Sequence, residues 1–421
     1  MTALLFLSFF AFLVLGLPIA IGLGLASAIT LVTQDVPLLI IVQRMFAGTD
    51  SFPLIAVPFF ILAGDILAKG QVSEKLVEFA DAMLGFIKGG LSVVAVVASM
   101  FFAAISGSGA ATTAAVGTTL VPELDKKGYD STSSSALIAA SGTIGVVIPP
   151  SVPMVLYAVV ADQSVTKLFL NGFVPGVAMG LILNGIAIFQ AYRRNYPRGA
   201  AFPIGNIMRT FKDAVWGIMT PVIILGGIFS GVFTPSEAAV IAVNYALVVS
   251  LFVYRDMTLK QVFEVIGKSA ITMSVVMFII ATSAVFSWIL ANWSIPNQIA
   301  EAVLAVSSNK YVIMFLITVI ILIAGVFMET ASALIILTPV FLPLVETLGI
   351  DLLHFGLVIV IGLAIGMVTP PVAINLYVAS TITGIPIEKI TRSIIPYLLG
   401  LVIVLLLWVY IPLLLPGLII Q

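Results

Sequence analysis

The chain has 421 residues, of which 61% are hydrophobic and only 9% are charged. Soluble domains carry about 25% charged residues, so this composition excludes an ordinary cytosolic enzyme and predicts an all-α, polytopic membrane protein. The formal net charge of −1 leaves no basic surface for nucleic acid. The chain has no cysteine and one histidine, His354, which excludes disulfides, thiolate metal sites and multi-histidine sites.

Membrane-spanning helices need about 20 mostly apolar residues, and the chain has many such runs. In chain order, we expect spans at 4–32, 53–69, 89–104 paired with 109–124, 132–161 with a break in its middle, 166–192, 213–233, 236–254, 269–291, 311–327 paired with 331–346, 353–383 with a second break, and 393–416. The first basic residue is Arg44. The first run therefore lacks the basic start of a cleavable signal peptide and should remain as an anchor.

The distribution of basic residues predicts the orientation, because Lys and Arg accumulate in cytoplasmic loops. With a cytoplasmic N-terminus and a periplasmic C-terminus, all but Arg44, Lys167 and Lys310 of the 18 Lys and Arg residues fall inside. We treat the two paired runs as re-entrant hairpins. Full double crossings would give the same loop sides, so the charges predict orientation but not re-entrance.

An internal repeat relates the two halves of the chain. The offset that carries Pro122 onto Pro343 also carries Asp130 onto Asp351, Pro149-Pro150 onto Pro370-Pro371, and Pro175 onto Pro396. In the expected topology the matching loops lie on opposite sides of the membrane, so the two copies are inverted. Inverted repeats with interrupted helices are typical of secondary transporters, whose site lies near the midplane where the repeats meet.

The repeat predicts a division of the chain. We expect a first half at 1–192, a cytoplasmic linker at 193–212 and a second half at 213–421. The hairpins are expected at 89–124 and 311–346, the broken helices at 132–161 and 353–383, a transport domain at about 89–161 plus 311–383, and amphipathic arms of the surrounding scaffold at 72–84 and 295–306.

Each repeat contains two segments that cannot be continuous helix. The first is a hairpin tip, Ser106-Gly107-Ser108-Gly109, where glycine permits an unwound backbone. The second runs from Gly145 to Pro150, where two prolines remove N–H donors and disfavour helical geometry before them. The counterparts in the second repeat are 325–332 and 366–371. Freed carbonyls are costly in lipid unless they line a cavity or bind a ligand.

Sodium is a suitable ligand for such carbonyls, because hard cations prefer oxygen. Helix N-termini at the breaks favour an anion and C-termini favour a cation. We therefore expect two cation sites with an anionic substrate between them. The alternative, a simple kink at each Pro-Pro pair, is weakened because both breaks are duplicated in register.

Ionisable residues within spans are candidates for function. Glu329, in the second hairpin tip, could hold a cation or proton, or could be a carboxylate satisfied by neighbouring backbone N–H groups. We expect Asp65 to be interfacial, Glu237 to be a favourable charge at a helix N-terminus, and His354 to be solvated or capping at the outer start of a broken helix.

Three segments resemble a known family, the large membrane subunit of tripartite ATP-independent periplasmic (TRAP) transporters. They are Ile105-Ser106-Gly107-Ser108-Gly109-Ala110-Ala111-Thr112, Ile148-Pro149-Pro150-Ser151 and Val368-Thr369-Pro370-Pro371. The resemblance implies an elevator-type, sodium-coupled protein of the bacterial inner membrane that takes up an organic acid, of the sialic acid or C4-dicarboxylate class. It also implies a periplasmic substrate-binding protein and a small four-helix membrane subunit, here a separate chain.

Carried over by position, the resemblance implies about two sodium sites. The first is expected at Ser106, Ser108, Gly145, Ile148 and Pro150. The second is expected at Gly325, Met328, Gly366, Thr369 and Pro371. Neither substrate-binding nor catalytic residues are assigned.

Three other functions remain as alternatives. One is a stand-alone sodium–dicarboxylate symporter of related architecture, which only partner dependence would distinguish. Another is an intramembrane serine protease with Ser108 as nucleophile and His354 as base. A nucleophilic serine needs its base within hydrogen-bond reach, and these residues are expected at different depths in the membrane. A purely structural scaffold, the third, has no need for duplicated breaks.

Overall fold

The structure is a computed structural model that describes residues 2–199 and 204–420. The described residues are helical throughout, apart from turns and one isolated β-bridge between Lys88 and Arg198. Eight of the described helices are long and apolar enough to cross a membrane. The all-α, polytopic prediction is therefore confirmed.

The first half folds into the following elements. They are α1 (Thr2–Val14), α2 (Ile19–Val32), α3 (Leu39–Thr49), the 3₁₀ helix η1 (Phe52–Ile55), α4 (Ala56–Lys69), α5 (Val72–Leu84), α6 (Gly90–Ser106), α7 (Gly109–Lys126), α8 (Ser131–Gly142), the 3₁₀ helix η2 (Thr143–Val146), α9 (Val152–Val160) and α10 (Val165–Arg193).

The second half follows the same plan. Its elements are α11 (Ile204–Phe229), α12 (Pro235–Val248), the π-helix η3 (Val249–Val253), α13 (Leu259–Asn292), α14 (Ile295–Val306), α15 (Lys310–Phe327), α16 (Thr330–Thr347), α17 (Leu352–Gly366), α18 (Ile374–Thr383), α19 (Ile387–Leu414) and the 3₁₀ helix η4 (Pro416–Leu418).

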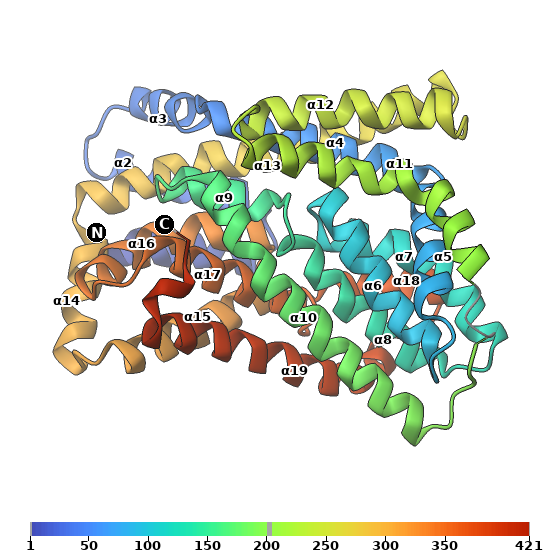
Figure 1. The fold of residues 1–421 in the computed structure, drawn as a ribbon. Coiled ribbons are helices and arrows are strands. Elements are labelled where there is room, and N and C mark those ends of the chain that lie inside the picture. Colours follow the sequence, from blue (N-terminus) through green and yellow to red (C-terminus); the bar gives the residue numbers. More distant parts are fainter. Residues whose placement is uncertain (1, 200–203, 421) are drawn as a thin grey trace.

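Helix boundaries reproduce the repeat. The repeat offset carries the start of α7 onto the start of α16 and the start of α8 onto the start of α17. Asp130 and Asp351 cap α8 and α17, and each accepts a hydrogen bond from the backbone N–H three residues on, at 2.7 and 3.0 Å. The arms α5 and α14 have the expected bounds and lie at opposite ends of the bundle (Figure 1). The copies are therefore inverted.

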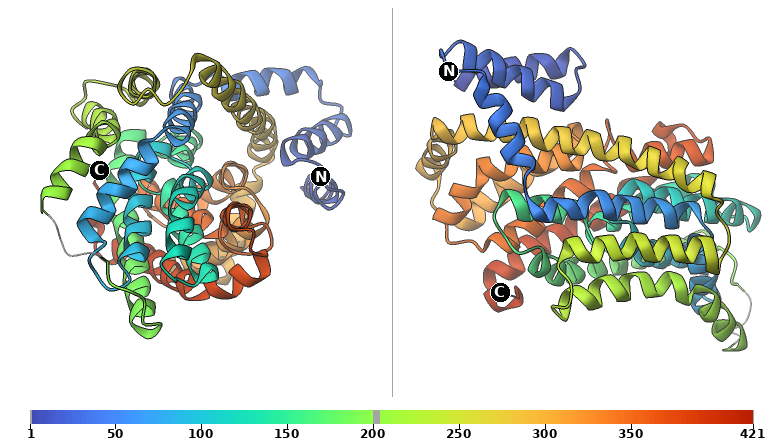
Figure 2. Two further views of the ribbon diagram at one scale, coloured as in Figure 1. Left: turned by 90° about the vertical axis from the view of Figure 1, so that its right-hand side faces the viewer. Right: turned by 90° about the horizontal axis from the view of Figure 1, so that it is seen from above.

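The predicted single span at 4–32 is wrong. Gly16 adopts a left-handed φ of +80° and Pro18 lacks an N–H donor, so the run breaks into α1 and α2, which pack against each other. At 13 and 14 residues, each helix is about 20 Å long at 1.5 Å per residue, too short to cross. Both views in Figure 2 show this pair at the edge of the molecule, and the two chain ends lie toward the same end of the bundle (Figure 1). The expected placement of the N-terminus opposite the C-terminus is therefore also wrong.

Other expected boundaries need smaller corrections. The linker predicted at 193–212 is shorter, because α11 already begins at Ile204; residues 200–203 lie outside the described residues. Helix α13 is longer than its expected span, since Thr258 caps it through a reciprocal bond with Gln261. Helix α3 was not expected. The favourable role of Glu237 is confirmed, because it forms a capping box with Thr234 at the start of α12.

Basic residues gather at the end of the bundle that carries α5. Lys69, Lys126 and Arg193 end α4, α7 and α10, and in Figure 1 the ends of α4 and α10 lie on the side opposite α14. Under the positive-inside rule this is the cytoplasmic end. We refer to it as the inner end and to the end carrying α14 as the outer end.

Two groups of helices surround the centre. Helices α10 and α19, which were expected in the scaffold, pack against each other and against α6, α8 and α17. Helices α4, α11, α12 and α13 form the other group, with α3 against α13 and α5 against α11. The two hairpins, α6–α7 and α15–α16, enter from opposite ends (Figure 1) and bring their tips to the region between the groups.

Candidate functional site

A cavity of about 190 Å³ lies where the two hairpin tips meet the two breaks. Its wall includes both tips, Val146 of the first break, Met367 of the second, and residues of α4 and α13. Its polar side chains are Asp65, Ser106, Ser108, Thr272, Glu329 and Thr330. Because the hairpins enter from opposite ends and both reach this cavity, each stops inside the protein, as the re-entrant interpretation expects.

Hydroxyl groups organise the first hairpin tip. Gly107 ends α6 in a left-handed conformation (φ +61°), which turns the chain back into α7. The Ser106 and Thr112 hydroxyl oxygens lie 3.0 Å apart, and Thr112 Oγ1 donates to the Ser108 carbonyl at 2.8 Å. Ser106 is 1% exposed and Thr112 is fully buried. The tip is therefore a compact, oxygen-rich loop.

The first tip and the first break are in close contact. A Cβ atom on Gly145 would lie 2.6 Å from the Ser108 carbonyl oxygen, and one on Gly107 would lie 2.7 Å from that of Pro150. Only glycine permits such approaches, since real Cβ contacts are almost never below 3.0 Å. The structure thus brings together Ser106, Ser108, Gly145 and Pro150, four of the five residues predicted for the first cation site.

Ile148, the fifth residue predicted for the first cation site, lies in a different environment from the other four. Its side chain lies against Gly176 of α10, while its backbone N–H donates to the Ile144 carbonyl at 2.9 Å. The break itself is stabilised by Ser151, whose buried hydroxyl donates to the Val146 carbonyl at 2.6 Å. That carbonyl would otherwise lack a helical donor, because residue 150 is a proline.

The second tip and the second break also approach closely. A Cβ atom on Gly325 would lie 3.2 Å from Gly366 Cα, and one on Gly366 would overlap the Gly325 carbonyl. Thr369 Oγ1 donates to the Ile365 carbonyl at 2.9 Å, and Val372 N–H donates to the Val326 carbonyl at 3.4 Å. Gly325, Gly366 and Thr369 of the second predicted cation site therefore lie together.

The remaining two members of that set are placed at its edges. The Met328 N–H donates to the Ala324 carbonyl at 2.9 Å where α15 ends. Pro371 is exposed, together with Pro370 and Val372, whereas residues 145–151 of the first break are all buried. The two breaks fall at matching positions of the repeat but differ in access: the first is enclosed and the second is open.

Glu329 both caps a helix and lines the cavity. Its Oε2 atom accepts hydrogen bonds from the backbone N–H groups of Ala331 at 2.9 Å and Ser332 at 3.1 Å. A satisfied carboxylate, one of the two expectations for this residue, is thus what the geometry shows. The repeat offset makes Glu329 the counterpart of Ser108, which caps α7 with a neutral hydroxyl.

Asp65 was expected to be interfacial, but it lines the cavity from α4. Its Oδ2 atom accepts a hydrogen bond from Ser269 of α13 at 2.6 Å. The neighbouring Gly64 lets α4 pack backbone to backbone on the first tip, because a Cβ there would lie 2.9 Å from Ser106 Cα. An aspartate inside the apolar run 53–69 was a signal of a functional position. Because Asp65 lies near the end of that run, the sequence analysis placed it at the membrane interface instead.

Two further polar residues were missed. Thr330 is 3% exposed and lines the cavity, and its hydroxyl has no hydrogen-bond partner among the described residues. Asn375, fully buried at the start of α18, donates from Nδ2 to the Ala139 carbonyl of α8 at 3.2 Å and from its backbone N–H to the Met367 carbonyl at 3.0 Å. It therefore joins the broken helices of the two repeats. A lone asparagine in an apolar run was the signal.

His354 is buried rather than solvated, with 2% of its surface exposed. Its Nε2 atom lies 2.9 Å from the Trp408 carbonyl oxygen of α19. It does not line the cavity to which Ser108 belongs. The described structure thus offers Ser108 no histidine base in that cavity, and the protease alternative loses its geometric support.

Known proteins resemble this chain over most of its length. A family model described as "Tripartite ATP-independent periplasmic transporter, DctM component" matches residues 6–414. The C4-dicarboxylate TRAP transporter large permease protein DctM of Pseudomonas aeruginosa is 40% identical over 394 residues, which cover 93% of this chain and 92% of that protein. The sialic acid TRAP transporter large permease protein SiaM of Vibrio cholerae is 36% identical over 391 residues, covering 93% and 92%.

Another relative is longer than this chain. The isethionate TRAP transporter permease protein DctMQ of Oleidesulfovibrio alaskensis is 41% identical over 407 residues, which cover 96% of this chain but only 64% of that protein. Among solved structures, the YdaH transporter of Alcanivorax borkumensis has a TM-score of 0.63 at 15% identity, over 89% of this chain and 87% of that one. This structural likeness supports the fold alone.

The family model covers residues 6–414, and the relatives are 36–41% identical over more than nine tenths of this chain. This chain therefore belongs to the DctM family of TRAP transporter large permeases and is a multi-pass protein of the bacterial inner membrane.

Proposed function

We propose that this chain carries out sodium-coupled uptake of an organic acid anion by an elevator mechanism. The observation that carries this proposal is the central cavity. Its lining contains two carboxylates, Asp65 and Glu329, and no Lys, Arg or His. An anion in such a cavity is repelled by both carboxylates at low dielectric. Cations bound beside it remove that penalty, so substrate and cation bind together.

The two breaks supply oxygen atoms for those cations. Around Gly145 the oxygen ligands are those of Ser106 and Ser108 and the carbonyls of the first break, as the predicted first sodium site requires. Around Gly366 they are the Gly325 carbonyl, the Thr369 hydroxyl and the carbonyls of the second break. All are neutral oxygen atoms, which suit a hard monovalent cation. The described residues contain no group of three or more His, Asp or Glu side chains that could hold a transition metal.

The packing suggests which parts move. The transport domain of about 89–161 plus 311–383 contacts α10 and α19 extensively, so these two helices move with it. The scaffold is then the group of α4, α11, α12 and α13 with the arms. The two bodies meet where the arm α5 packs against α6, where the arm α14 packs against α16 and where α13 packs against α16. They also meet at the backbone contact between Gly64 and Ser106, a small-residue contact over which one surface can slide.

Partners complete the proposed system. A periplasmic binding protein delivers the substrate to the outer end, and a separate small four-helix subunit extends the scaffold. The substrate belongs to the organic acids that the relatives' names mention, among them C4-dicarboxylates and sialic acid. The stand-alone symporter remains the second candidate, with no observation that favours it.

Reconstituted vesicles test the proposal. Uptake of a labelled acid is measured with this chain, the small subunit and the loaded binding protein, under an inward gradient of sodium or of potassium. We expect uptake with sodium only, and no substrate binding in sodium-free buffer. Undiminished uptake with potassium would overturn the coupling. Full uptake by the isolated chain would favour the stand-alone symporter.

A further inference from the structure

One carboxylate in the wall of the central cavity has no cation beside it. Asp65, on α4, accepts a hydrogen bond from the buried Ser269 hydroxyl of α13 at 2.6 Å. No Lys, Arg or His of the described residues lines the cavity, and no ion pair among the described residues includes Asp65. A hydroxyl that donates to a carboxylate stabilises its ionised form. A carboxylate charge of α4 therefore faces the cavity without a counter-ion.

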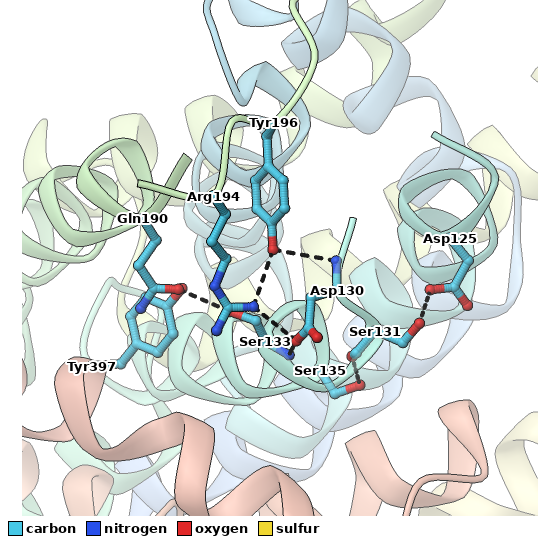
Figure 3. Close-up of polar contacts among 9 residues, drawn as sticks. All are labelled: Asp125, Asp130, Ser131, Ser133, Ser135, Gln190, Arg194, Tyr196 and Tyr397. Carbon is cyan, nitrogen blue, oxygen red and sulfur yellow. Dashed lines mark hydrogen bonds and ion pairs between the residues drawn. The ribbon is translucent and has the colours of Figure 1, made fainter. Parts of the chain in front are cut away.

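Two other carboxylates that join separate helices or loops are paired with a cation. Arg194 forms an ion pair with Asp130 at 3.0 Å beside the start of α8 (Figure 3). Lys69, one helical turn after Asp65 in α4, lies 3.6 Å from Glu264 of α13. Joining α4 to α13 at Asp65 needs only a hydrogen-bond acceptor, which a neutral amide would supply as well. The unpaired charge of Asp65 is therefore not explained by the packing of these two helices.

The wall of the cavity divides between the two bodies of the proposed elevator. Among the described residues, Asp65 is the one charged side chain that the scaffold contributes, whereas Ser106, Ser108 and Glu329 belong to the transport domain. Asp65 follows Gly64, whose backbone lies against Ser106 of the first predicted cation site. The charge of Asp65 therefore acts on ligands of this cavity, but it does not travel with them when the transport domain slides.

We propose that Asp65 is a specificity-determining residue of the cavity, whose charge admits sodium first and excludes the organic acid anion until sodium is bound. The inference rests on the proposed function, because it needs both ligands in the cavity. A fixed negative charge attracts sodium and repels the anion, and both effects are stronger in the protein interior than in water. The empty cavity therefore favours sodium. Bound sodium then offsets the repulsion, and the anion can enter.

Asp65→Asn separates the charge from the hydrogen bond. The amide oxygen of asparagine can still accept from the Ser269 hydroxyl, so the link between α4 and α13 is kept and only the charge is lost. We expect two shifts of opposite sign. Sodium should bind about tenfold more weakly, and the acid should bind about tenfold more tightly in sodium-free buffer, each change being equal to about 1.4 kcal/mol. A purely structural role would change both affinities in the same direction.

Three matched variants separate the charge of Asp65 from other effects. Ser269→Ala removes the hydrogen bond and keeps the charge, so it should lower thermal stability without the opposite shifts. Glu264→Gln removes a carboxylate that joins the same two helices but does not line the cavity, and it should leave both affinities unchanged. Asp65→Ser, a second neutral variant, should give the same pair of shifts as Asp65→Asn. Opposite shifts with Ser269→Ala or Glu264→Gln would overturn the proposal.

The two affinities are measured on the chain with its small subunit in lipid nanodiscs. Thermal unfolding, with sodium titrated against potassium at constant ionic strength, reports sodium binding. Labelled succinate and labelled sialic acid, each titrated in sodium and in potassium buffer, report acid binding. Wild-type binding that is equal in sodium and potassium, or absent for both acids, would overturn the proposed function. If the wild type binds an acid in sodium only and the neutral variants show no opposite shifts, only the role of Asp65 fails.

Discussion

A single methyl group at Gly145 tests the first cation site. In Gly145→Ala the new Cβ atom would lie 2.5 Å from Thr112 Oγ1 and 2.6 Å from the Ser108 carbonyl oxygen. Ordinary contact begins at 3.4 Å, so both oxygen atoms must move by the better part of an ångström. Metal–oxygen distances in protein sites vary by only about 0.2 Å. We therefore expect sodium affinity to fall at least about tenfold.

The size of the effect can be read from stability. Sodium at about 100 times its dissociation constant stabilises the folded chain by about 2.7 kcal/mol, whereas a tenfold weaker site leaves about 1.4 kcal/mol at the same concentration. The sodium-dependent part of the thermal shift should thus be roughly halved. A separate loss of about 1–3 kcal/mol, from overpacking a tight contact, is expected without sodium.

The matched control is Gly185→Ala in α10, where a Cβ atom would meet nothing within 4 Å. It should raise the baseline stability by about 0.5–1 kcal/mol, because alanine favours a helix interior over glycine, and it should leave the sodium-dependent shift unchanged. Thermal unfolding in detergent, with sodium titrated against potassium, measures the two quantities separately. A normal sodium-dependent shift in Gly145→Ala, with or without lower baseline stability, would refute the assignment of this glycine to a cation site.

Three further changes address other residues. Thr330→Val should raise the substrate concentration needed for half-maximal uptake severalfold, because it removes a buried hydroxyl that lines the cavity. The control Thr338→Val removes an equally unpartnered buried hydroxyl elsewhere and should leave that concentration unchanged. Equal effects of the two changes on uptake would contradict a role for Thr330. Asn171→Ala should destabilise the fold by about 2 kcal/mol, because it removes two hydrogen bonds to the Ile420 backbone at about 1 kcal/mol each. It should also expose the residues after α19 to carboxypeptidase. Unchanged digestion would contradict this role of Asn171. Burial raises the pKa of Asp81 in the arm α5, so its ionised form opposes folding. Asp81→Asn should therefore stabilise the chain near pH 7, with the gain fading as pH falls toward the unfolded value of about 3.9, and a gain that persists at pH 3 would show another cause.

The repeat made much of the fold predictable from the sequence. Proline and glycine report backbone constraints directly, so the Pro-Pro pairs and the Ser106–Gly109 tip marked both unwound regions and their counterparts. Asp130 and Asp351 matched in the repeat, and in the structure each caps the helix that follows it. The arms were found because their apolar residues recur at helical spacing. All of these are local signals that tertiary packing leaves unchanged.

The errors have equally physical causes. In 4–32 every residue is compatible with lipid, so hydropathy could not separate one long helix from two short ones, although Gly16 and Pro18 offered the signal. Asp65 was misplaced because depth along a helix does not reveal which neighbours surround it. The contact of the residues after α19 with Asn171 of α10 was overlooked because it joins positions 249 residues apart. Contacts between distant segments cannot be seen in a single sequence.

The differences between equivalent positions carry the functional argument further than the similarities do. Duplication supplies two tips and two breaks at matching positions. At the tips, Ser108 and Glu329 are counterparts in the repeat. Ser108 caps α7 with a neutral hydroxyl, and Glu329 caps α16 with a carboxylate. At the breaks, Val146 and Met367 are counterparts in the repeat. The Val146 carbonyl accepts a hydrogen bond from the Ser151 hydroxyl, whereas the Met367 carbonyl accepts one from the Asn375 backbone N–H. A symmetric pair of sites would bind its ligands alike from both sides of the membrane. In the proposed mechanism a partner delivers the substrate at one face only, so the two ends must differ, and these positions are where the two copies do differ.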